Sequence, residues 1–128
     1  MKKIIPLILI LSTVLLLSCR EKTSVTPETV AGTYTGTIPA ASSPGIDLTV
    51  TLRPDKTWTV IMLYIDEDGG PFESTGKYSI DSSDNTIRLE TGHRPYLFRS
   101  KGSDLLWLDG DGNEITGDLA DMYVLHRQ

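Results

Sequence analysis

The chain has 128 residues, of which 39% are hydrophobic, and its 12 basic and 17 acidic side chains give a formal net charge of −5 at pH 7. This length suffices for one domain with its own buried core. The acidic balance argues against nucleic acid as a partner, because a nucleic-acid binder needs a basic patch.

The beginning of the chain predicts export. Lys2 and Lys3 precede an apolar run that ends in the sequence Leu-Leu-Ser-Cys, with the cysteine at position 19. The run is shorter than the ~20 apolar residues of a membrane-spanning helix, and its charged start and small residue near the end are typical of a cleaved leader. We therefore predict a signal peptide over residues 1–18.

Cys19 is the single cysteine of the chain. The preceding Leu-Leu-Ser resembles the cleavage box of bacterial lipoproteins, in which the cysteine is lipidated and becomes the mature N-terminus. The alternative is an ordinary signal peptide with an incidental thiol, but a thioether to diacylglycerol would remove the redox liability of a lone exported thiol. Two or three acyl chains, palmitate among them, hold a protein stably on a bilayer. We predict that Cys19 is the lipid anchor and that the membrane is a partner through it.

Residues 19–30 are predicted to be the lipidated N-terminus and a flexible tether, because they are polar, lack an apolar period and contain Pro27. Residues 19–128 hold ten basic and seventeen acidic residues, a net charge of −7, since Lys2 and Lys3 leave with the leader. This charge argues against further attachment to anionic lipid. No acidic sorting signal distinguishes the inner membrane, the outer membrane or the cell surface; among these envelope locations we favour the outer membrane.

The stretch 31–65 predicts three consecutive antiparallel strands. In 32–38, threonines alternate with Tyr34, Gly and Ile, and in 46–52 Ile, Leu and Val alternate with Asp and Thr. This two-residue period is typical of a strand with one buried and one exposed face. Two prolines mark residues 39–45 as a loop, and Arg-Pro-Asp-Lys at 53–56 favours a tight turn. The third strand, 57–65, becomes apolar on both faces, so we expect its second half to be covered on both sides or to face a partner or ligand.

Shorter runs with the same period predict further strands at residues 72–80, 86–90, 96–100, 105–108 and 122–126. Gly76 indicates a bulge or bend in the first of them. Eight short strands without a useful helical period predict an all-β fold. A meander of hairpins hides its edges by closing, so we expect a small antiparallel meander barrel over residues 31–128.

Acidic loops raise the question of calcium. Residues 109–114, Asp-Gly-Asp-Gly-Asn-Glu, place carboxylates at alternate positions, but an EF-hand would need glycine at position 114 and glutamate at position 120, where Glu114 and Ala120 stand. We therefore favour a glycine-rich hairpin between Leu108 and Ile115. A weak calcium site stays open there and, with less support, at Asp66–Asp68.

No other constellation indicates chemistry. His93, His126, Met62 and Met122 share no ligand spacing, and nucleophile, phosphate-loop and zinc-protease motifs are absent from the sequence. We predict no enzyme, no catalytic residue, no cofactor and no metal site.

At least six aromatic residues lie on predicted strands, and large side chains of this kind fill the core of small barrels. They are Tyr34, Trp58, Tyr64, Tyr78, Phe98 and Trp107. The alternative is that several of them line a cavity for a lipid or another small apolar ligand. A filled and a hollow barrel share the same alternation, so both readings stay open.

Several of these motifs occur in an order that resembles the N-terminal domain of the NlpE lipoproteins. They are Gly-Thr-Tyr-Thr-Gly-Thr-Ile-Pro at 32–39, Pro-Gly-Ile at 44–46, Asp55 with Thr-Trp-Thr at 57–59 and, more loosely, Gly-Lys-Tyr at 76–78, Leu-Trp-Leu-Asp at 106–109, Gly112, Ile115, Tyr123, Leu125 and Arg127. The resemblance implies a lipocalin-like barrel in the bacterial cell envelope. It also implies envelope-stress or surface sensing by contact with another envelope protein.

The sequence departs from this family in the loop after the first strand. The family commonly carries Cys-x-x-Cys between the two prolines, and the corresponding residues are Ala40 and Ser43. Neither can act as a thiolate ligand or close a disulfide, so a copper or redox role is not carried over. We expect a binding or contact role, with a carrier of a small apolar ligand or an accessory subunit of a surface complex as alternatives.

Overall fold

The computed structural model describes residues 25–41 and 43–128. In this part of the chain eight strands follow one another as an antiparallel meander and close into a barrel. The strands are β1 (Gly32–Ile38), β2 (Ile46–Leu52), β3 (Thr57–Tyr64), β4 (Phe72–Asp81), β5 (Thr86–Leu89), β6 (Tyr96–Lys101), β7 (Asp104–Trp107) and β8 (Val124–Arg127). The predicted all-β, lipocalin-like meander barrel is confirmed. The predicted signal peptide 1–18, Cys19 and the tether up to residue 24 lie outside the described residues.

Two short helical segments accompany the barrel. The helix α1 (Pro27–Val30) precedes β1, and the 3₁₀ helix η1 (Ala120–Tyr123) precedes β8. The described helices include none that is long and apolar enough to cross a membrane. Because residues up to Tyr123 form η1, β8 begins two residues later than the predicted strand 122–126.

The helix α1 differs from the flexible segment expected for residues up to 30. Thr26 caps it reciprocally with Thr29: each threonine accepts a hydrogen bond from the backbone N–H of the other. Pro27 occupies the first turn, where its missing N–H costs nothing. Val30 then enters the core with 1% of its surface exposed, so this turn is part of the domain.

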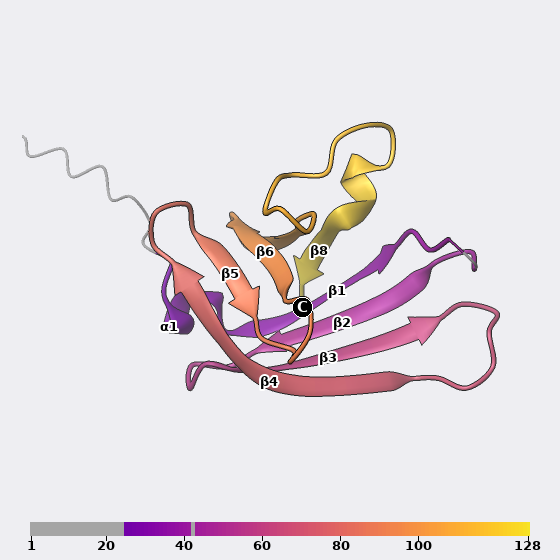
Figure 1. Cartoon of the computed structure of the whole chain (residues 1–128), viewed down its shortest axis with the longest axis horizontal. Helices are drawn as coiled ribbons and strands as arrows, with labels where there is room; N and C mark the ends of the chain where they lie inside the picture. The colour runs from indigo at the N-terminus through magenta and orange to yellow at the C-terminus, as the bar shows by residue number, and fades with distance from the viewer. Residues whose placement is uncertain (1–24, 42) are drawn as a thin grey trace, which may run out of the picture.

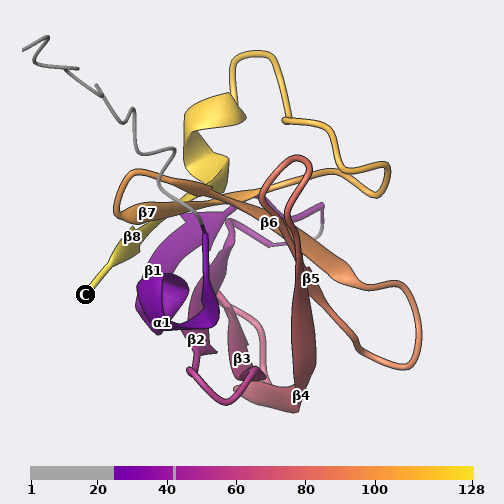
Figure 2. The ribbon, with the colours of Figure 1, turned by 90° about the vertical axis from the view of Figure 1, so that its left-hand side faces the viewer.

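The alternation of β1 and β2 becomes the inner face of the barrel. In β2, Ile46, Leu48, Val50 and Leu52 are buried, while Asp47 between them is exposed. The two strands pair along their whole length, from Gly32 opposite Leu52 to Ile38 opposite Ile46. β1 to β3 and the first half of β4 form a long sheet, and the shorter β5 to β8 lie across it (Figures 1 and 2).

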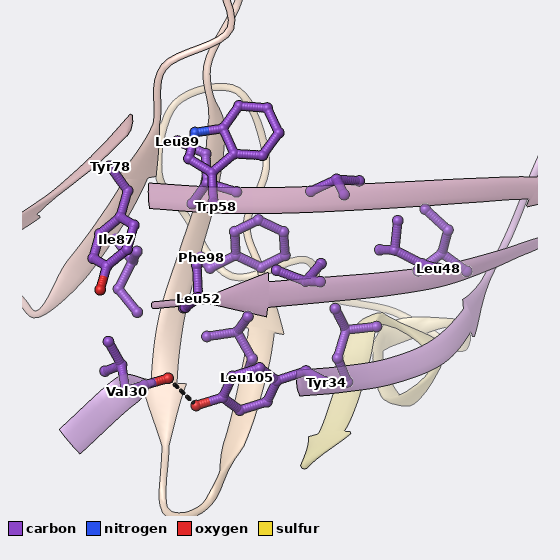
Figure 3. Packing of buried hydrophobic residues seen from close by; sticks show 14 of the residues in the cluster. Val30, Tyr34, Leu48, Leu52, Trp58, Tyr78, Ile87, Leu89, Phe98 and Leu105 are labelled. Atoms are coloured by element: carbon purple, nitrogen blue, oxygen red, sulfur yellow. Dashed lines mark hydrogen bonds between the residues drawn. The ribbon is translucent and has the colours of Figure 1, made fainter. Parts of the chain in front are cut away.

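Side chains fill the interior where these two parts face each other (Figure 3). Of the six aromatic residues named above as candidates for the core, four are buried: Tyr34, Trp58, Tyr78 and Phe98. Tyr64 and Trp107 are half-buried and pack against the same cluster. An edge-to-face pair of Phe98 and Trp107, with ring centroids 4.9 Å apart, extends the cluster along β6 and β7. The barrel is therefore built around packed aromatic and aliphatic side chains.

β4 belongs to both parts of the barrel. It pairs with β3 from Phe72 to Lys77 and with β5 from Tyr78 to Asp81. At Gly76, next to this change of partner, a Cβ atom would lie 2.6 Å from the backbone oxygen of Glu90 and 2.9 Å from the Trp58 ring. β4 curves along its length from one part to the other (Figure 1), as the predicted bend requires.

A short seam closes the barrel. β8 pairs with β1 at two positions, where Arg127 lies opposite Tyr34 and His126 opposite Thr35. Beyond β8, the backbone N–H of Gln128 donates to the Thr33 oxygen at 2.9 Å.

Candidate functional site

Two loops meet at one end of the barrel, which we call the hairpin end. It consists of the β1–β2 loop (39–41 and 43–45) and the β3–β4 hairpin (61–73), which lie together on the right of Figure 1. The backbone N–H of Ile65 donates to the Gly45 oxygen at 3.0 Å, so the loops are hydrogen-bonded to each other. This contact fixes the position of the hairpin relative to the loop.

Large apolar side chains are exposed at the hairpin end. Leu63 is 42% exposed on the outer face of β3, and Phe72, at the start of β4, is 55% exposed. Phe72 packs edge to face against Tyr64, with ring centroids 6.0 Å apart. The expectation that the second half of β3 is covered on both sides is therefore wrong for the described chain, because Leu63 lies opposite the exposed Asp47 on a face that no described element covers. The alternative that this half faces a partner or ligand stays a prediction.

Acidic residues border these apolar side chains. Asp66, Glu67 and Asp68 form the exposed tip of the hairpin. Asp47, opposite Leu63, accepts a hydrogen bond from the Thr37 hydroxyl at 2.7 Å. Leu63 and Phe72 point to opposite faces of the hairpin and both border Gly70, so the exposed apolar surface wraps around the hairpin beside these acids. Such a surface suits a partner with apolar contacts and basic side chains around them.

Ala40 and Ser43 lie in the β1–β2 loop. Ala40 is half-buried and packs against the core. The Ser43 hydroxyl donates to the Gly45 oxygen at 2.8 Å and so stabilises the turn before β2. Both residues therefore have structural contacts in the loop.

The glycine-rich segment 109–114 is the predicted hairpin. One carboxylate oxygen of Asp109 accepts from the backbone N–H groups of Asp111 and Asn113, both at 2.9 Å, and Leu108 forms an antiparallel bridge with Glu114. The acid nearest the start of the loop is thus used to hold the turn. Across residues 25–41 and 43–128, no group of three His, Cys, Asp or Glu side chains is placed to hold a metal ion.

The two histidines lie apart from these loops. His126 is exposed on β8, with its Nδ1 3.2 Å from a carboxylate oxygen of Asp104. His93 is exposed in the loop between β5 and β6, where its backbone N–H donates to the Thr91 hydroxyl at 3.1 Å. These surface positions agree with the solvated or structural roles expected for them.

A polar pocket of about 460 Å³ on the outer face of β4, β5 and β6 was not predicted. Its residues come from positions 79–113, and only the strand pairing brings them together. Leu63 at the hairpin end did leave a signal, because the second half of 57–65 is apolar on both faces. The pocket left none, because outward-facing polar residues on strands look like ordinary solvated positions.

The fold defines a class: small domains built as an eight-stranded, lipocalin-like meander barrel. Within this class, residues 34–118 match the NlpE N-terminal domain, and the chain belongs to that family. The resemblance seen in the sequence is thereby confirmed. The comparison with curated proteins gives no match.

Two solved structures support this assignment. A predicted lipoprotein from Shewanella oneidensis is 35% identical, with a TM-score of 0.70 over 77% of this chain and 88% of that chain. The Cpx pathway activator NlpE from Escherichia coli is 28% identical, with a TM-score of 0.59 over 68% of this chain. The match spans 46% of the length of the E. coli chain. One of these relatives is thus described as a lipoprotein and the other as an activator of the Cpx pathway.

Proposed function

We propose that this chain is a lipid-anchored lipoprotein of the bacterial envelope that acts in envelope-stress or surface sensing by contact with another envelope protein. Family membership and the pathway activator among its relatives support this role. The observation that carries the proposal is the exposure of Leu63 and Phe72 at the hairpin end, since apolar side chains grouped on a surface mark interaction sites. The chain works by binding and not by catalysis.

The anchor in this proposal is Cys19, exposed by removal of residues 1–18, and the location is the outer membrane. The Leu-Leu-Ser-Cys sequence and the lipoprotein among the relatives support the anchor. Ala40 and Ser43 replace the thiols of the family loop, so a copper role is not part of the proposal. Replacement of Cys19 by serine is expected to abolish both labelling with radioactive palmitate and recovery in the membrane fraction.

The carrier alternative has less support. A lipocalin-like carrier would hold its ligand inside the barrel, and this interior is occupied by side chains such as Trp58, Phe98 and Leu48, which are at most 1% exposed. The accessory-subunit alternative uses the same surface as the contact role. A stable complex with neighbouring proteins would distinguish it from transient sensing.

The test of the contact role is site-specific photo-crosslinking of the full-length lipoprotein in intact cells. A photoreactive residue at position 63 or 72 is expected to give a discrete crosslinked product, whereas the same residue at Ser82, in the exposed turn between β4 and β5, is not. The double variant Leu63→Ser and Phe72→Ser should lower affinity for the captured partner about tenfold or more, because central apolar contacts dominate interfaces. Its melting temperature should stay close to that of the parent.

Equal crosslinking at all three positions would contradict the proposal. So would an unchanged affinity of the double variant for the captured protein. Recovery of an apolar small molecule from the purified lipoprotein by extraction and mass spectrometry would favour the carrier instead.

A further inference from the structure

The pocket on the outer face of β4, β5 and β6 is separate from the hairpin end. Outward-facing side chains of the three strands form its floor: Ser79 and Asp81 on β4, Thr86 and Arg88 on β5, and Arg99 on β6. The segment 111–113 forms one wall, fixed by a hydrogen bond of 3.2 Å from an Arg99 nitrogen to the Gly112 oxygen. A volume of about 460 Å³ is within the range of small-molecule sites.

Two buried polar atoms in this pocket lack a hydrogen-bond partner among the described residues. They are Nε of Arg99 and Oγ1 of Thr86, and Thr86 as a whole is only 9% exposed. Buried donors and acceptors in folded proteins are paired in the great majority of cases. Both atoms are shielded from solvent as the side chains stand, so an acceptor in the pocket reaches them only when the partly exposed Arg99 side chain shifts. A carboxylate then offers one oxygen to each of them.

The charges of Arg99 are only loosely compensated. Its terminal nitrogens lie 3.9 Å from a carboxylate oxygen of Asp84 and 3.7 Å from one of Glu114, both beyond hydrogen-bond length. The pocket also has an acidic side, since Asp81, Asp84 and Asp111 line it. One oxygen each of Asp81 and Asp84 holds a backbone turn, at Ser83 and Thr86 respectively.

These two sides select the class of ligand. A simple anion would satisfy Arg99 and Thr86 but would face three carboxylates, and a simple cation would leave the Arg99 Nε–H without an acceptor. A molecule that carries both charges satisfies both sides. We propose that this pocket binds a small zwitterion of the amino-acid type, free or as the end of a short peptide, with its carboxylate on Arg99 and Thr86 and its ammonium on the acidic side.

The test is isothermal titration of the full-length lipoprotein in detergent micelles with each of the twenty amino acids in turn, and with alanyl-alanine. Acetate and methylamine serve as probes that carry one charge only. At least one zwitterion should bind ten times more tightly than either probe. Tighter binding of the dipeptide than of alanine would identify a peptide end as the ligand, and the reverse a free amino acid.

The variant Thr86→Val keeps the shape of the side chain and removes the hydroxyl. It should weaken zwitterion binding about tenfold, the effect of one lost hydrogen bond to a charged group, while its melting temperature stays the same or rises. Thr75→Val, on the outer face of β4 away from the pocket, is the matched control and should bind like the parent. The proposal is overturned if no zwitterion binds more tightly than acetate and methylamine, or if Thr86→Val binds as well as Thr75→Val. Neither result would affect the contact role of the hairpin end.

Discussion

At the residue scale, Arg127 connects the closing strand to the beginning of the domain. Its guanidinium donates to the backbone oxygens of Ala31 and Thr29, at 2.9 and 3.0 Å, and to the Tyr34 hydroxyl at 2.7 Å. That hydroxyl in turn donates to the Val30 oxygen at 2.7 Å. The planar fork of arginine can reach several acceptors at once, which the ammonium of lysine cannot do in the same geometry.

We expect Arg127→Ala to lower the free energy of unfolding by about 2 kcal/mol, because it removes several charge-assisted hydrogen bonds at a partly exposed site. Arg127→Lys should recover less than half of this loss. Urea denaturation followed by circular dichroism measures both. Lys101→Ala, at an exposed position at the end of β6, should stay within about 0.5 kcal/mol of the parent. An Arg127→Ala variant as stable as Lys101→Ala would contradict this role.

At the scale of single elements, the bend of β4 depends on Gly76. Any side chain there would press against the backbone oxygen of Glu90, which cannot move away as a flexible side chain could, and against the buried Trp58 ring. Overpacking of a tight core typically costs 1–3 kcal/mol and sometimes more.

Gly76→Ala is therefore expected to lower the free energy of unfolding by about 3 kcal/mol and the melting temperature by roughly 10 °C or more. Differential scanning calorimetry measures the shift. Gly110→Ala is the matched control, because a Cβ there would meet only the end of the Arg94 side chain, at 3.9 Å. If both variants melt at the same temperature, the close approach at Gly76 does not constrain the fold.

The strands could be predicted from the sequence because one physical property, burial of alternate side chains, determines them. β1 and β2 have the predicted bounds, and the pattern of β2 is seen as buried and exposed positions in the structure. The helix α1 was missed because four residues are too short for a period, although Thr26, Pro27 and Thr29 carry the chemistry of a helix start.

The polar pocket could not be predicted for a different reason. Thr86 and Arg99 lie opposite each other on paired strands, and Asp111 is added by a loop that folds back over the sheet. Such neighbours depend on strand register and on the path of a loop, which composition and periodicity do not determine. At the hairpin end, by contrast, the residues are close in sequence, so part of that site was visible.

At the scale of the whole molecule, two pairs of groups contribute to the pH dependence of stability. Hydrogen bonds from Thr57 to Asp55, and from Ser83 to Asp81, hold the pKa of each carboxyl below its ordinary value of 3.8. Burial raises the pKa of Tyr34 and of Tyr78 above the ordinary value of 10.0. The lowered carboxyl pKa values stabilise the fold above pH 3.8, and this contribution is lost as the pH falls through the folded-state values. The raised tyrosine pKa values stabilise the fold below pH 10.0, and this contribution is lost as the pH rises through the folded-state values.

We predict a plateau of stability between about pH 4 and pH 10, with a decline on each side. The double variant Asp55→Asn and Asp81→Asn should be less stable than the parent at pH 6, and this gap should narrow as the pH falls through the folded-state pKa values of the two carboxyls, where the parent also loses these charges. Tyr78→Phe should decline less steeply than the parent above pH 10. Urea denaturation at fixed pH values measures the gap. A gap that does not narrow as the pH falls would show that the charge of these carboxylates does not stabilise the fold.

The position of β8 has a consequence for how the protein is made. Because β1 can complete its pairing only with β8, a chain whose last residues have not yet been added presents two open sheet edges until residues 124–127 have arrived. A premature stop codon shortly before position 124 would leave those edges open permanently. Such a truncated product would lack only Leu125 among the buried residues, together with half-buried Val124 and three exposed residues. We nevertheless expect proteases of the envelope to degrade it as efficiently as a variant whose core does not pack.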